Sequence, residues 1–85
     1  MSDNELEEAY KHSFNNKSEI LKSDICGCFY CGRIFNPKKI TIWLYGDVDM
    51  TAQCPYCFVD SVIGESSGYA ITNKFLNDMY KKWFN

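Results

Sequence analysis

The chain has 85 residues, of which 46% are apolar and 16% aromatic, and its formal net charge is −2. This length predicts a single domain, 1–85. Burial alone seldom gives so short a chain more than about 3 to 5 kcal/mol of stability, so we expect a cross-link to reinforce the core. The negative charge and the scattered basic residues argue against nucleic acid as a partner.

Neither a signal peptide nor a membrane span is evident from the sequence. The first eight residues carry four acidic side chains and no basic ones, and no apolar run approaches the length of a membrane span. We therefore expect a cytoplasmic protein with no membrane partner. In a reducing compartment, five cysteines are better explained as metal ligands than as disulfides.

The N-terminal residues predict a helix from Asp3 to about Phe14. Ser2 stands three residues before Glu5, which is the spacing of a capping box. Apolar residues then recur one helical turn apart, at Leu6, Tyr10 and Phe14. Two asparagines should end this helix, and the following segment, KSEILK, should add a short turn with Ile20 and Leu21 packed inward. Together these elements form a helical N-terminal extension, 1–24.

Residues 25–63 are predicted to form the zinc-knuckle core. The segment ICGCFYCGRIF has no helical period and is typical of a strand that enters and leaves a metal knuckle. The segment KITIWLYG, rich in β-branched and aromatic residues, predicts a strand, and DMTAQ is the expected returning strand. After the last cysteine, the segment FVDSVIGESSGYA is expected to be a loop because of its glycines and serines.

A C-terminal amphipathic helix is predicted over residues 72–85, with Thr72 as its N-cap. Its apolar positions are Phe75, Leu76, Met79, Tyr80, Trp83 and Phe84. This stripe is wider than a small hairpin can cover. We expect the N-terminal helix to pack against it. The alternative is that part of the stripe stays open for a partner.

Two Cys-x-x-Cys pairs carry the strongest functional signal: Cys28 with Cys31, and Cys54 with Cys57. A two-residue gap lets both sulfurs of a pair face one ion, and two pairs complete a tetrahedron. We expect one structural Zn²⁺ held by these four thiolates. Such a site leaves no coordination position for water, so we expect no catalytic residues and no enzyme activity. Phe58 follows the second pair, where the first pair has a glycine.

Four further residues are weaker candidates for function. Cys26 is interpreted as a partly buried thiol. One alternative is that it replaces Cys28 as a ligand by pairing with Cys31, although the tighter gap of Cys28 matches the second pair. The other is that it is an oxidation-sensitive neighbour of the metal. His12 is the only histidine, and we expect it at the surface because no second imidazole is present to build a catalytic group with it. Asp60 and Ser61 are expected to belong to a turn or a cap.

The segments CGCFYCGRIF, TAQCPYCFVDSVIG, SGYAIT and FLNDMYKKWF together resemble a family of small uncharacterised bacterial cytoplasmic proteins with a zinc-ribbon-like core. The resemblance spans nearly the whole chain. It implies the same four cysteine ligands and a bacterial, cytoplasmic origin, but it implies no activity. A second resemblance, of CFYCGRIFNP and CPYC, is to rubredoxins, whose iron site uses similar pairs. Phe58 and the two flanking helices depart from that pattern.

These observations predict an α+β fold, in which a zinc-ribbon-like β-hairpin core with two metal knuckles lies between an N-terminal helix and a C-terminal helix. A treble-clef arrangement, with a helix directly after Cys57, is the alternative. The expected function is that of a noncatalytic module that binds another protein. The alternatives are a rubredoxin-like iron electron carrier, a zinc-dependent nucleic-acid binder and an enzyme with an open metal position. Self-association is not decided by the sequence.

Overall fold

The computed structural model describes residues 2–84, which form a mixed α+β structure of short helices and small antiparallel sheets. Within these residues, three α-helices and five strands are joined by short 3-10 turns at 11–13, 37–39 and 65–67. In chain order the elements are α1 (Asp3–Tyr10), α2 (Lys17–Leu21), β1 (Cys26–Cys28), β2 (Ile34–Phe35), β3 (Trp43–Leu44), β4 (Thr51–Ala52), β5 (Val62–Gly64) and α3 (Asn73–Trp83).

The strands form two separate antiparallel sheets. In the three-stranded sheet the order is β2-β1-β5, so Cys26 of the central strand lies opposite Phe35 on one side and Gly64 on the other. The second sheet is the hairpin β3-β4, in which Trp43 lies opposite Ala52. Strand β1 leads into the first Cys-x-x-Cys pair and is hydrogen-bonded to β2 on one edge and to β5 on the other. The position of that pair is therefore fixed by the sheet.

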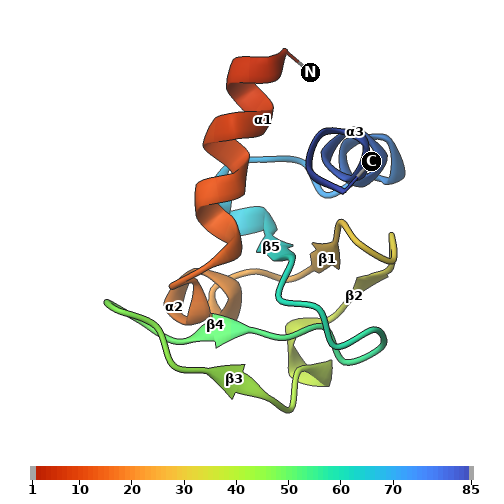
Figure 1. Cartoon of the computed structure of the whole chain (residues 1–85). Helices are drawn as coiled ribbons and strands as arrows, with labels where there is room; N and C mark the ends of the chain where they lie inside the picture. The colour runs from red at the N-terminus through yellow and green to blue at the C-terminus, as the bar shows by residue number, and fades with distance from the viewer. Residues whose placement is uncertain (1, 85) are drawn as a thin grey trace.

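The three-stranded sheet separates two hydrophobic clusters. Helices α1 and α3 lie on one side of β1 and β5, and the β3-β4 hairpin lies on the other (Figure 1). A Cβ at Gly27 would stand 2.8 Å from Ile71 and 2.9 Å from Leu76. Only glycine at this position lets Ile71 and helix α3 pack directly on the sheet. The helix-side cluster contains Leu6, Ala9, Phe29, Ile63, Ile71, Phe75, Leu76 and Met79. The hairpin-side cluster contains Ile20, Cys26, Cys28, Phe35, Ile40, Ala52, Cys54 and Val62.

The helix starts agree with the sequence prediction, but the end of the first helix does not. The Ser2 side chain accepts a hydrogen bond from the Glu5 amide, and the side chain of Thr72 caps α3 by accepting from the Phe75 amide. Helix α1 ends at Tyr10 rather than near Phe14. The Ser13 hydroxyl donates to the Tyr10 carbonyl at 2.7 Å, which favours a tight turn over another helical turn.

The expected packing between the two terminal helices is confirmed. Leu6 of α1 is buried in one cluster with α3, Tyr10 stacks on Trp83 with ring centres 4.3 Å apart, and Lys82 lies 3.6 Å from Glu7. Phe14 takes no part and is 45% exposed, because it follows the end of the helix. The predicted C-terminal helix extends to residue 85, which lies outside the described residues.

Two further expectations were wrong. The segment expected to be a loop contains β5, a fully buried strand, so Cys57 leads into a strand rather than into the treble-clef helix. The short helix α2 was predicted, but only Ile20 packs inward; Leu21 is 58% exposed. Adjacent helical residues point about 100° apart, so a single-turn helix buries one of them and not the other.

Within residues 2–84, the structure contains no helix that is both long enough and apolar enough to cross a membrane.

Candidate metal site

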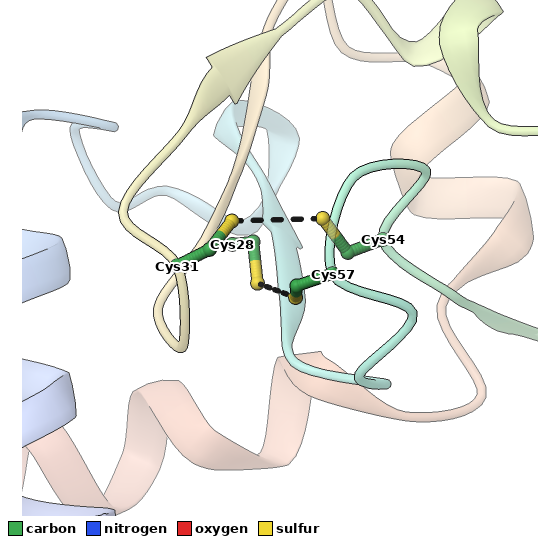
Figure 2. Close-up of side chains that lie close together, drawn as sticks. All are labelled: Cys28, Cys31, Cys54 and Cys57. Atoms are coloured by element: carbon green, nitrogen blue, oxygen red, sulfur yellow. Dashed lines mark hydrogen bonds between the residues drawn. The ribbon is translucent and has the colours of Figure 1, made fainter.

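Four cysteines from two distant parts of the chain are placed to hold one metal ion. Their sulfur atoms all lie within 4.8 Å of one another. The Sγ atoms of Cys28 and Cys57 are 3.6 Å apart, and those of Cys31 and Cys54 are 3.7 Å apart (Figure 2). A tetrahedral site with metal–sulfur bonds of about 2.3 Å requires sulfur–sulfur edges of about 3.8 Å. The cluster therefore has the size of a four-thiolate metal site. Each cysteine of the first pair lies close to one cysteine of the second pair.

The first pair begins at Cys28, the last residue of β1, and its second member, Cys31, lies in the turn before β2. The Gly32 amide donates to the Cys28 carbonyl at 2.8 Å, the Cys28 amide donates to the Arg33 carbonyl at 2.9 Å, and the Tyr30 amide approaches the Cys28 sulfur at 3.4 Å. Gly32 has φ +79°, a left-handed conformation that glycine adopts without steric cost. This turn points both sulfurs of the pair to the same side.

The second pair, between β4 and β5, repeats this turn. The Phe58 amide donates to the Cys54 carbonyl at 3.0 Å, the Cys54 amide donates to the Val59 carbonyl, and the Tyr56 amide approaches the Cys54 sulfur at 3.4 Å. Phe58 adopts φ +67°, although its ring is 61% exposed and gains little from packing. A left-handed non-glycine residue costs on the order of 1 to 3 kcal/mol. The missing glycine thus leaves the turn geometry unchanged and adds local strain.

The electrostatics of the cluster favour a bound cation. Burial raises the pKa of the Cys57 thiol, and the neighbouring Cys28 raises it further. Burial likewise raises the pKa of Cys31. Burial also opposes ionisation of Cys54, but the amides of Cys57 and Tyr56 and the adjacent thiols lower its pKa overall. Four thiolates this close repel one another, so a metal ion is what allows all of them to ionise together.

Access to the site is one-sided. Cys28 and Cys54 are buried in the hairpin-side cluster, Cys57 is half-buried and Cys31 is exposed. The inner ligands therefore belong to the hydrophobic core, and a metal held by them would connect the β1-β2 turn directly to the β4-β5 turn. The outer ligands lie at the surface, where the ion can enter and leave.

Ser61 lies beside the candidate site, and the sequence prediction missed this position. It was expected in a turn or a cap, but it is 2% exposed and its hydroxyl lies 3.2 Å from the Cys28 sulfur. A hydroxyl at this distance can donate a hydrogen bond to a thiolate and stabilise its negative charge. Its carbonyl accepts from the Phe29 amide at 3.0 Å, which fixes its position beside the first pair. No short motif marks this role, because the contact joins residues 33 positions apart.

We expect Ser61→Ala to lower metal affinity about tenfold, because residues that hydrogen-bond a ligand tune how strongly it binds. Competition with a coloured chelator measures this affinity. Ser66→Ala is the matched control, since Ser66 is an exposed serine whose hydroxyl does not contact the site. Equal affinities in the two variants would show that the Ser61 hydroxyl does not support the ligand.

The remaining candidates lie outside the metal cluster. Cys26 is completely buried, and its sulfur contacts the Phe35 carbonyl at 3.5 Å. Burial, with smaller contributions from Cys54 and Cys28, raises the pKa of Cys26 to about 12. A buried thiol that resists ionisation is a poor target for oxidants, which argues against a redox role.

His12 is half-buried rather than fully at the surface. Its Nδ1 atom lies 2.9 Å from a Glu19 carboxylate oxygen, and its ring lies at 5.9 Å from the ring of Tyr69. His12 therefore links the turn after α1 to α2 and does not approach the cysteines as a ligand. Asp60, beside Ser61, is exposed.

Fold and site together define a small α+β protein with a four-cysteine metal-binding cluster. No protein-family model matches the chain, and comparisons with curated proteins and with solved structures give no significant match. The family resemblances drawn from the sequence thus gain no support from these comparisons, and the site itself is the basis for function.

Proposed function

We propose that the chain is a small zinc protein of zinc-ribbon-like design, in which Cys28, Cys31, Cys54 and Cys57 hold one structural Zn²⁺. The observation that carries this proposal is the packing of four sulfurs within 4.8 Å. Thiolate-only tetrahedral sites select zinc or iron among the common metals. With all four positions filled by sulfur, zinc has no site for a reacting water, so the protein is noncatalytic.

The metal acts in folding. Its ligands lie in two turns separated by the β3-β4 hairpin, and two of the ligands belong to the hairpin-side cluster. The strands are only two or three residues long, so hydrogen bonds alone would hold them weakly. Zinc supplies the missing stability, because an unfolded chain has no preformed site and the binding free energy becomes folding free energy.

The working surface in this proposal is a set of aromatic rings beside the first pair. Tyr30 is 45% exposed, Phe84 is 42% exposed, and their ring centres are 5.0 Å apart. A groove of about 320 Å³ separates the first turn from α3 and is bordered by Tyr30, Tyr80, Asn73 and Asn77. Aromatic anchors carry much of the free energy at protein interfaces, and side-chain amides can bond a peptide backbone. We therefore assign this groove to a cytoplasmic protein partner that inserts an apolar side chain.

A rubredoxin-like iron carrier is the second candidate, and one observation favours it. Backbone amides approach the sulfurs of Cys28 and Cys54 from equivalent positions in the two turns. Amide–sulfur hydrogen bonds of this kind tune the potential of an iron–thiolate centre. The net charge of −2 speaks against the third candidate, a nucleic-acid binder, because phosphate binding depends on clustered basic residues.

Metal analysis of the purified protein tests the central proposal. We expect one zinc per chain and a colourless solution, whereas a red, iron-containing protein would support the electron carrier instead. For the surface, Tyr30→Ala combined with Tyr80→Ala should keep the zinc and lose the proteins captured by the wild type. Phe14→Ala, which removes an equally exposed ring elsewhere, should keep them. Unchanged capture by the double variant would refute the assignment of the groove.

A further inference from the structure

The outer edge of β3 has no strand beside it within residues 2–84 (Figure 1). The Gln53 amide donates to the Ile42 carbonyl at 3.2 Å, and Leu44 lies opposite Thr51. In an antiparallel ladder the hydrogen-bonded residues alternate, so Ile42 and Leu44 direct their backbone groups toward β4. Trp43 between them directs its N–H and C=O groups outward. This edge is therefore a template for one more strand.

The side chains along this edge are unusually apolar for a solvated hairpin. Tyr45 is 95% exposed and Val48 is 89% exposed at the tip of the hairpin, while Ile42 and Leu44 are 45% and 38% exposed. Proteins commonly protect a free edge with a charge in the middle of the strand. Here no charged side chain lies between Ile40 and Gly46, and four large apolar residues of the hairpin are exposed instead.

Charges of opposite sign lie at the two ends of this edge segment, residues 40–46. Lys38 and Lys39 precede it, and Asp47 follows it. Lys39 and Asp47 are both exposed, and neither forms an ion pair with another residue in the part of the chain that the structure describes. The nearby Asp49 is already engaged, since it accepts from the Ser18 and Met50 amides. The segment is thus complementary to an antiparallel copy of itself.

We propose that a second copy of this chain pairs with the outer edge of β3, which joins the two hairpins into a four-stranded sheet, β4-β3-β3-β4. A two-fold axis beside Trp43 lets the outward backbone groups of the two copies bond to each other. Ile42 of each copy then lies opposite Leu44 of the other. Lys39 ends the 3-10 turn before this edge and Asp47 lies in the bend after it, so the pairing brings Lys39 of each copy to the same end of the sheet as Asp47 of the other. The surface is separate from the metal site and from the aromatic groove.

Sedimentation velocity of the zinc-loaded protein tests the pairing, from micromolar to millimolar concentration. We expect a concentration-dependent dimer. Thr41→Pro should be monomeric, because it removes an N–H group that faces the second copy. Ile40 already has ψ 124°, which suits a residue before proline, so this variant should fold. A wild type that stays monomeric throughout, or a Thr41→Pro variant that dimerises normally, would overturn the proposal.

A charge exchange tests the register independently of the proline. Asp47→Lys should raise the dimer dissociation constant about tenfold, because each interface contains the pair twice and reversal makes both pairs repulsive. Adding Lys39→Asp to that variant should restore the wild-type constant. Lys22→Asp, an exposed charge change outside the segment, is the control and should have no effect. Failure of the double variant to recover would contradict the pairing with Lys39 opposite Asp47.

Discussion

Cys31→Ser or Cys54→Ser should release the metal and unfold the chain. Structural zinc sites have apparent binding free energies on the order of 10 kcal/mol, whereas a small domain is stable by only about 5 kcal/mol. Losing one of the four ligands, and the metal with it, therefore removes more free energy than the free energy of unfolding of the whole domain. The two residues occupy opposite turns of the site, so both turns should depend on the metal. Circular dichroism and metal analysis of each variant measure the two losses together.

Cys26→Ser provides the matched control. Cys26 is as buried as Cys28 and Cys54 and lies in the same cluster, but it is not among the four converging sulfurs. Because Cys26 is not a ligand, its substitution should be nearly silent for metal binding. Burying a hydroxyl in its place should lower the free energy of unfolding by about 1 to 2 kcal/mol. The variant should still carry one metal ion per chain. A Cys31→Ser protein that binds no metal yet keeps its circular dichroism and melting temperature would contradict the structural role of the metal.

The features that sequence alone predicted are those set by short spacings. The two-residue gap within each cysteine pair determines that both sulfurs can face one point, whatever the rest of the fold does. The caps of α1 and α3 are equally local, since each bond joins residues three positions apart. The first helix ended early because Ser13, a residue inside the apolar repeat, bonds back to the chain.

The features that sequence could not predict depend on long-range contacts. Strand β5 lies in a segment whose glycines and serines are typical of loops, and it becomes a strand because β1 pairs with it: Gly27 lies opposite Ile63. Burial on both faces of the sheet then stabilises it. Ser61 reaches the Cys28 sulfur only because the two strands lie side by side. Both features follow from one strand pairing, and that pairing has no local signature.

The contacts of Asn16 are also long-range and have no local signature, and its substitution should have the second large effect. From the sequence, Asn15 and Asn16 are expected only to end the first helix, but Asn16 is 2% exposed and its side chain bonds three backbone groups. Its amide donates to the carbonyls of His12 and Val62, at 2.8 Å each, and its oxygen accepts from the Ala52 amide at 3.1 Å. Ala52 ends the strand before the second cysteine pair, and Val62 begins the strand after it. Asn16 therefore holds together both ends of the segment that presents Cys54 and Cys57.

Asn16→Ala should lower the free energy of unfolding by about 3 to 5 kcal/mol, because it leaves one buried amide and two carbonyls without partners. It should also weaken metal binding, since the second cysteine pair loses its anchor. Chemical denaturation and chelator competition measure the two effects. Asn77→Ala is the control: this asparagine is exposed on α3, where alanine favours the helix by a few tenths of a kcal/mol. An Asn16→Ala protein as stable as that control would show that water or a shift of the backbone replaces all three bonds. A variant that is destabilised but binds the metal with unchanged affinity would show that Asn16 supports the fold without positioning the second pair.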